Sequence, residues 1–103
     1  MSDAVTKTTP KAKAKPKTER PKFYKVILLN DDFTPRDFVV EVLRSVFRMT
    51  EGEAMGVMLT AHQTGACVVA VFTREVAEEK AAQANDLGRD AGYPLAFTTE
   101  REN

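Results

Sequence analysis

The polar stretch from Asn30 to Pro35 constrains the fold of this chain most strongly. It stands between an apolar run, Tyr24–Leu29, and a segment whose apolar residues recur with the period of a helix. The run is rich in β-branched and aromatic residues, which is typical of a strand. The sequence therefore predicts a strand, a short polar turn and a helix in succession, with an amide and two carboxylates at the junction.

The helix after this turn is expected to start at Thr34 and Pro35. Threonine can cap a helix, proline suits the first helical position, and Asp37 favours the positive end of the helix dipole. Its apolar face is predicted from residues at helical spacing, namely Phe38, Val39, Val42, Leu43, Val46 and Phe47.

A second helix and a second strand follow. Thr50 and Glu53 match a capping box, and this helix is expected to stop near Gly65. The apolar segment Ala66–Phe72 then predicts a strand.

The last predicted elements are a helix and a short strand. Thr73 is the expected cap of a helix from Arg74 to about Leu87, and Gly88 is the expected stop. A third strand is predicted over Pro94–Thr99. The order βααβαβ predicts one small α+β domain over residues 23–103, in which a three-stranded antiparallel sheet packs against three helices.

Charge separates the first 22 residues from this domain. They hold seven of the fifteen basic residues and two of the fifteen acidic ones, so a tail of +5 precedes a body with eight basic and thirteen acidic residues, or −5. Because the tail has three prolines and almost no large apolar residue, we expect it to be disordered. It can be interpreted as a nucleic-acid arm or as a flexible, solubilising extension. We favour the second, because the basic residues are sparsely spaced and no aromatic residue is interleaved, and we expect no nucleic-acid partner.

Composition also indicates the compartment. The single cysteine, Cys67, excludes an internal disulfide and suits a reducing environment. The N-terminus lacks the apolar core of a secretory signal, and the longest apolar run, Cys67–Phe72, is too short to span a bilayer. We expect a soluble cytoplasmic monomer without a membrane partner.

The polar turn has the chemistry of a site for a free α-ammonium group. Such a group offers three donors and a positive charge, so it needs acceptors. Alternation along an extended chain points Asn30 and Asp32 the same way and Asp31 away, which leaves Asp31 a supporting or electrostatic role. His62, the only histidine, lies one helical turn after Met58 and can add an imidazole acceptor. Met58 would then line the apolar part of the site.

Each of these local signals also fits a plainer interpretation. The polar turn can be solvated, His62 can be a packed or surface residue, and methionines are common in cores. An enzyme using Asp31, Asp32 and His62 is disfavoured because no nucleophile and base are paired. The same three residues lack the usual spacing of metal ligands, so we expect no metal and no cofactor.

Four segments in order resemble the ClpS family, the bacterial adaptors of the N-end rule pathway. They are Tyr24–Pro35, Met58–His62, Val71–Lys80 and Tyr93–Leu95, and the resemblance covers about residues 22–100. It implies an adaptor without enzymatic activity. Such an adaptor binds proteins whose first residue is Leu, Phe, Tyr or Trp and delivers them to the N-terminal domain of the unfoldase ClpA, for degradation by the peptidase ClpP. The N-terminal extension would take part in handing the substrate over.

The resemblance also implies roles for individual residues. The α-amino group would be held by Asn30, Asp32 and His62, with Asp31 in support. The side-chain pocket would be formed by Leu28, Leu29, Thr34, Val39, Met58, Ala61 and Leu95, with Arg36 at its rim. Glu75 and Lys80 would contact the unfoldase. The main rival is a ribosome- or nucleic-acid-associated domain, because a ribosomal stalk protein has a domain of similar fold.

Three positions depart from the usual family pattern. Arg36 replaces a common methionine, Ala61 a common valine and Phe33 a common tyrosine. Alanine enlarges the cavity, and an arginine can lie over an aromatic ring but gains nothing comparable from leucine. We therefore expect a preference retuned toward aromatic first residues. A second, divergent paralogue would show such departures.

Overall fold

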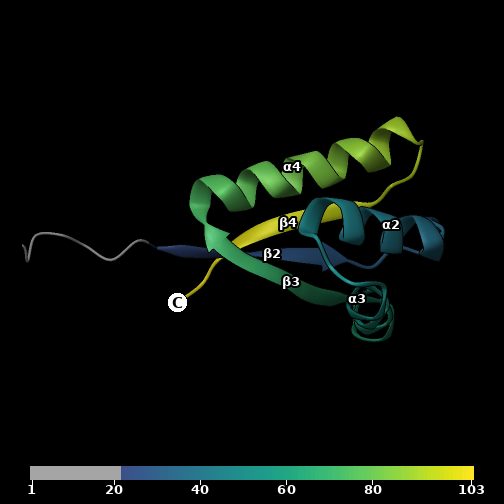
Figure 1. The fold of residues 1–103 in the computed structure, drawn as a ribbon, viewed down its shortest axis with the longest axis horizontal. Coiled ribbons are helices and arrows are strands. Elements are labelled where there is room, and N and C mark those ends of the chain that lie inside the picture. The colour runs from purple at the N-terminus through teal and green to yellow at the C-terminus, as the bar shows by residue number, and fades with distance from the viewer. Residues whose placement is uncertain (1–21) are drawn as a thin grey trace, which may run out of the picture.

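Six elements follow one another in the predicted order (Figure 1). The structure is a computed structural model and describes residues 22–103. The elements are β2 (Phe23–Leu29), α2 (Arg36–Phe47), α3 (Glu51–Thr64), β3 (Ala66–Thr73), α4 (Arg74–Asp90) and β4 (Ala96–Arg101). The α+β fold class, with three antiparallel strands and three helices, is confirmed. Apart from Lys22, the predicted tail lies outside the described residues.

The sheet has the order β3-β2-β4, so the first strand in the chain is the central one. Both pairings are antiparallel. A bulge lies opposite Val26 and Ile27, where β3 carries one extra residue, Val69. Beyond the bulge Leu28 pairs with Cys67 on one side and with Phe97 on the other. The side chains of Val26, Leu28 and Phe97 are buried on the same face.

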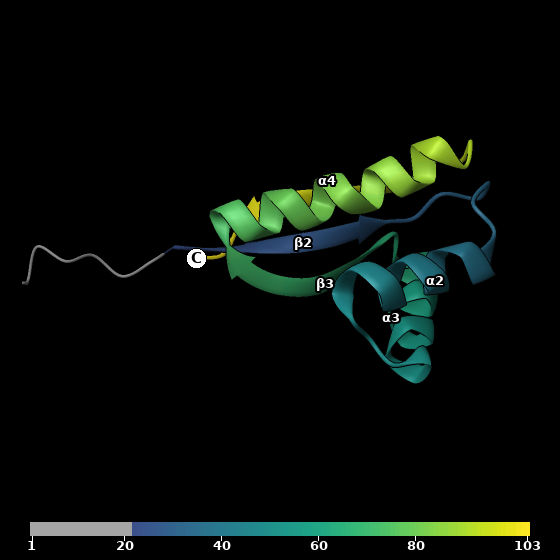
Figure 2. The same ribbon diagram turned by 45° about the horizontal axis from the view of Figure 1, so that its top comes forward.

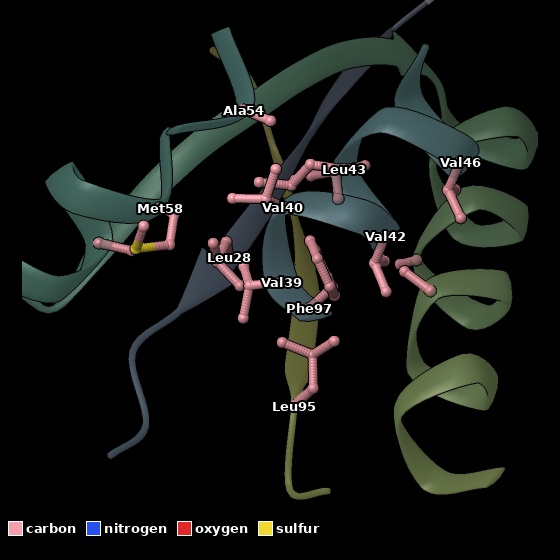
Figure 3. Packing of buried hydrophobic residues seen from close by; sticks show 14 of the residues in the cluster. Leu28, Val39, Val40, Val42, Leu43, Val46, Ala54, Met58, Leu95 and Phe97 are labelled. Carbon is pink, nitrogen blue, oxygen red and sulfur yellow. The ribbon is translucent and has the colours of Figure 1, made fainter. Parts of the chain in front are cut away.

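The helices divide between a face and an end of this sheet. α4 runs along one face and contacts all three strands, whereas α2 and α3 pack together near the end of β2 (Figures 1 and 2). The core between these layers contains Val26, Leu28, Val39, Val40, Val42, Leu43, Val46, Ala54, Met58, Ala61, Ala77, Ala81, Ala84, Leu95 and Phe97 (Figure 3). Within residues 22–103, no helix has the length and apolar character needed to cross a membrane.

Polar side chains tie α4 to its neighbours. The Asn85 side chain accepts from the backbone N–H of Phe97 at 2.7 Å and donates to its carbonyl at 3.0 Å. The Lys80 ammonium donates to the carbonyl of Val46 at 2.9 Å, where α2 ends. All three bonds satisfy backbone groups that packing removes from water.

The start of α2 differs from the prediction. Pro35 is the N-cap, with φ −58° and ψ 140°, and Arg36 is the first helical residue. Thr34 was therefore wrongly predicted as the cap. Its hydroxyl bonds to the carboxylate of Asp31 instead, so no side chain caps this helix. The competing bond within the turn decides the outcome.

The other helix ends show one success and one error. The capping box of α3 is confirmed, since Thr50 and Glu53 exchange bonds of 2.9 and 3.1 Å. Gly65, at φ +97°, ends this helix as predicted. Gly88 does not end α4, which continues to Asp90. The left-handed residue after α4 is Gly92, at φ +84°, and Gly88 is buried inside the helix.

Candidate functional site

A cavity of about 300 Å³ opens at the end of β2. It lies between the turn after that strand, the start of α2, the end of α3 and the segment that leads into β4. Its lining is Leu28, Leu29, Asn30, Asp31, Asp32, Phe33, Thr34, Pro35, Arg36, Val39, Met58, Ala61, His62 and Leu95. The structure thus brings together every residue that the sequence suggested for the amine site and the side-chain pocket.

The floor of the cavity is part of the hydrophobic core. We define the floor as Leu28, Val39, Met58, Ala61 and Leu95, which are all buried. In Figure 3, Leu28 of β2 and Val39 of α2 lie next to each other, with Met58 of α3 to one side and Leu95, from the segment before β4, below them. An apolar floor of this kind favours a ligand group that water solvates poorly.

The turn beside the floor is organised by one carboxylate. Asp31 accepts from the backbone N–H groups of Phe33 and Thr34 at 2.8 and 2.7 Å. The buried Thr34 hydroxyl donates to the same carboxylate, with its oxygen 3.0 and 2.9 Å from the two carboxylate oxygens. Asp31 is therefore engaged inside the turn, which is typical of an Asx turn.

The rim of the cavity is polar and accepting. We define the rim as Asn30, Asp32 and His62, whose side chains are exposed. The Asn30 backbone N–H donates to the Gly65 carbonyl at 3.0 Å, which joins the turn to the end of α3. His62 stands in the last turn of α3, where the helix dipole is negative. The rim therefore suits a small cation with several hydrogen-bond donors.

The structure offers little support for metal or thiol chemistry. Among residues 22–103, no three His, Cys, Asp or Glu side chains are grouped so that they could hold a metal ion. Burial raises the pKa of the Cys67 thiol, which disfavours the reactive thiolate.

Two residues of the cavity wall were missed as site residues. Phe33 and Pro35 line the opening, and Phe33 is 80% exposed. An aromatic residue inside an otherwise polar turn was the available signal, since a large exposed apolar side chain often marks a binding surface.

The two residues suggested for unfoldase contact lie elsewhere. Both are on α4, and neither lines the cavity. Glu75 is exposed in the first turn. Lys80 is half-buried, with its ammonium bound to the Val46 carbonyl.

Comparisons with known proteins give the family of this chain. Residues 19–98 match the family model described as "ATP-dependent Clp protease adaptor protein ClpS". The chain is 65% identical to ATP-dependent Clp protease adapter protein ClpS 1 of Bradyrhizobium diazoefficiens, over 99% of both chains. It is 59% identical to ClpS 2 of Agrobacterium fabrum, also over 99% of both chains. Relatives thus carry either number, and the names do not assign this chain to one paralogue.

A solved structure extends the agreement to three dimensions. The structure of Agrobacterium tumefaciens ClpS2 bound to L-phenylalaninamide superposes with a TM-score of 0.80 and is 60% identical. The match covers 81% of this chain and all of that one. The family consists of adaptor proteins rather than enzymes, as its name states. This chain belongs to the ClpS family of adaptors of the ATP-dependent Clp protease.

Proposed function

We propose that this adaptor binds the free α-amino group and the bulky first side chain of proteins that begin with Phe, Tyr, Trp or Leu. It delivers them to the N-terminal domain of a ClpA-type unfoldase for degradation by ClpP. The observation that carries the proposal is the cavity itself, in which an apolar floor adjoins a rim of hydrogen-bond acceptors.

The rim matches an α-ammonium group in charge and in hydrogen bonding. Asn30 offers a carbonyl oxygen, Asp32 a carboxylate and His62 the lone pair of a neutral imidazole. Three acceptors from two elements can satisfy the three donors of the ammonium group. Because Asp31 is occupied by the turn, its contribution is to hold Asn30 and Asp32 in place and to add negative charge.

The floor matches one large side chain. A volume of about 300 Å³ is at the lower end of the range for ligand pockets, which suits a single side chain better than a long peptide. The related protein from Agrobacterium tumefaciens is bound to L-phenylalaninamide, which carries a free amine and a benzyl group on one carbon. Its amide resembles the first peptide bond of a protein.

Fluorescence anisotropy with three short labelled peptides tests the proposal. One begins with Phe, the second is its N-acetylated twin and the third begins with Leu. Acetylation removes the charge and two of the donors, so we expect the twin to lose nearly all binding. Equal affinity for the free and acetylated peptides would exclude recognition of the α-amine.

Arg36 and Ala61 are proposed to set the preference among first residues. Arg36 lies at the cavity opening, where its guanidinium can stack on a bound aromatic ring. Ala61 leaves room on the floor that a valine would fill. We expect Arg36→Met to lower the affinity for a Phe-first peptide more than for a Leu-first peptide. An unchanged ratio would remove Arg36 from this role.

Delivery is proposed to use α4 together with residues 1–22, with the adaptor acting as a monomer. Glu75 is the freer contact, because the Lys80 ammonium already binds the end of α2. Charge reversal in Glu75→Arg is expected to weaken binding to the isolated N-terminal domain of the unfoldase and to leave peptide affinity unchanged. Titration of that domain with both variants checks this, and Glu79→Arg, an exposed charge reversal on the same helix, is the matched control.

A further inference from the structure

Gly88 allows α4 to lie unusually close to the floor of the cavity. A β-carbon built at this position would be 2.8 Å from Cβ of Leu95 and 3.5 Å from its Cδ2, whereas ordinary contact begins at 3.4 Å. Glycine in a helix interior is less stable than alanine, so helix propensity does not explain the residue. The close approach to Leu95 does.

Leu95 is held in this position from both sides along the chain. The N–H of Tyr93 donates to the Gly88 carbonyl at 2.9 Å. The Tyr93 ring packs on Phe38 with centroids 4.9 Å apart. The Asn85 side chain fixes both backbone groups of Phe97. These contacts fix the residues two positions before and two positions after Leu95, which restricts its movement along the helix.

The side chain of Leu95 lies between α4 and the cavity. It is buried against Gly88 and also lines the cavity floor. Figure 3 shows it below Phe97, with α4 to one side and Leu28 and Val39 to the other. If a side chain is added at position 88 and α4 stays in place, Leu95 must move away from the helix, toward Leu28 and Val39 (Figure 3).

We propose that Gly88 is a specificity-determining positioning residue. By lacking a β-carbon it lets Leu95 withdraw toward α4, and this sets the depth available to the first side chain of a substrate. The inference rests on the proposed function of the cavity. It adds a residue that touches no ligand and acts only through Leu95.

The test compares Gly88→Ala with Gly56→Ala. Position 56 is also helical, and nothing lies within 4 Å of a β-carbon there. Peptides that begin with Trp, Phe or Leu are titrated against each variant and the parent. We expect Gly88→Ala to weaken Trp-first binding by about tenfold, with a smaller loss for Phe and the smallest for Leu, because overpacking affects the largest group most. Gly56→Ala should leave the three affinities in their parental ratio.

A double variant separates positioning from general damage. In Leu95→Gly the β-carbon that would lie 2.8 Å from the one built at position 88 is absent, so adding Gly88→Ala should change the Trp-to-Leu ratio by less than twofold. The same loss of ratio with and without Leu95 would overturn the inference. So would an unchanged ratio in Gly88→Ala when the parent binds all three peptides.

A measurement on the protein without ligand tests the role of Gly88 separately from the proposed function of the cavity. Methyl NMR can report the distance between the Leu95 and Val39 methyl groups without any ligand. We expect stronger nuclear Overhauser effects between them in Gly88→Ala than in the parent. Unchanged effects would show that α4 moves outward instead, and the inference would be wrong even if the peptides bind. A parent that binds no peptide would refute the proposed function and, with it, the role in specificity.

Discussion

The rim and the floor of the cavity are built in different ways. The rim residues are exposed and lie on a turn and at the end of a helix, whereas the floor residues belong to the core of the domain. A change at the rim should therefore alter binding without altering stability. A change at the floor should alter both. Arg36 lines the cavity, is exposed and belongs to neither set, so a change there can alter the proposed preference at a low cost to the fold.

The rim needs no packing because backbone hydrogen bonds hold it. The turn is closed by the bonds of Asp31, and Asn30 is fixed by its bond to Gly65. Within residues 22–103, the side chains of Asn30, Asp32 and His62 make no hydrogen bond, which leaves their acceptors available to a ligand. This separates the groups that shape the rim from the groups that bind.

The largest effect is expected at the floor. Met58→Ala removes a side chain that is 6% exposed, so we expect a loss of about 2 to 3 kcal/mol in the free energy of unfolding. Affinity for a Phe-first peptide should fall as well, because the ring loses part of its contact surface. Urea unfolding and anisotropy measure the two quantities. Met55→Ala is the control, since Met55 lies on the same helix but is 43% exposed and outside the cavity.

The rim should give a smaller and purely functional effect. Asp32→Asn keeps the shape but removes the charge, so a charge-assisted bond of about 1.5 to 3 kcal/mol is weakened and affinity should fall at least about fivefold. Stability should change by less than about 0.5 kcal/mol, as for other exposed positions. Asp37→Asn is the matched control, because it removes the same charge near the start of α2 but outside the cavity. Equal losses in the two variants would mean that only long-range charge matters.

The turn lies between these cases. Asp31→Ala removes the acceptor of two backbone N–H groups and of a buried hydroxyl, so we expect stability to fall by about 1 to 2 kcal/mol. Affinity should also fall, because Asn30 and Asp32 lose their common support. Asp31→Asn retains one acceptor oxygen and should recover part of both losses. Full affinity in Asp31→Ala would break the link between turn and rim.

These differences explain what could be predicted from the sequence. Element order and the capping box follow from local signals, and both were confirmed. Composition and periodicity alone left the site open between a cation site and a solvated turn. The pocket residues come from β2, α2, α3 and the segment before β4, and local patterns cannot show that such distant segments meet. The family resemblance was therefore the source of these residues.

The two wrong predictions concern helix ends whose position depends on a competing hydrogen bond or on a contact with a distant residue. Thr34 was expected to cap α2, but its hydroxyl bonds to Asp31. Gly88 was expected to end α4, because a late glycine in a helical pattern usually does. A β-carbon at this position would instead lie 2.8 Å from Cβ of Leu95, seven residues further along the chain. A local pattern contains neither fact.

Lys80 lies on α4, outside the cavity, so a change there should affect stability but not peptide binding. Lys80→Met keeps the aliphatic stem but leaves the Val46 carbonyl without its donor, so we expect a loss of about 1 kcal/mol in unfolding free energy. Peptide affinity should stay unchanged. Lys25→Met is the control, because its ion pair with Glu100 is long, at 3.9 Å, and partly exposed. If Lys80→Met also weakens binding to the unfoldase, this stability loss must be measured before a direct contact is assigned.

The smallest effect should come from the acceptor on His62. His62→Leu removes the imidazole but keeps an aliphatic side chain, so an ammonium group bound at the rim would lose one of its three acceptors. Because His62 is exposed, water can replace the lost bond, and we expect the affinity for a Phe-first peptide to fall by about two- to fivefold. His62→Gln keeps an acceptor and should retain most of the parental affinity. Anisotropy titrations of the parent and the two variants measure this. Equal affinity in all three would remove His62 from the amine site and leave Asn30 and Asp32 as the residues that hold the amine.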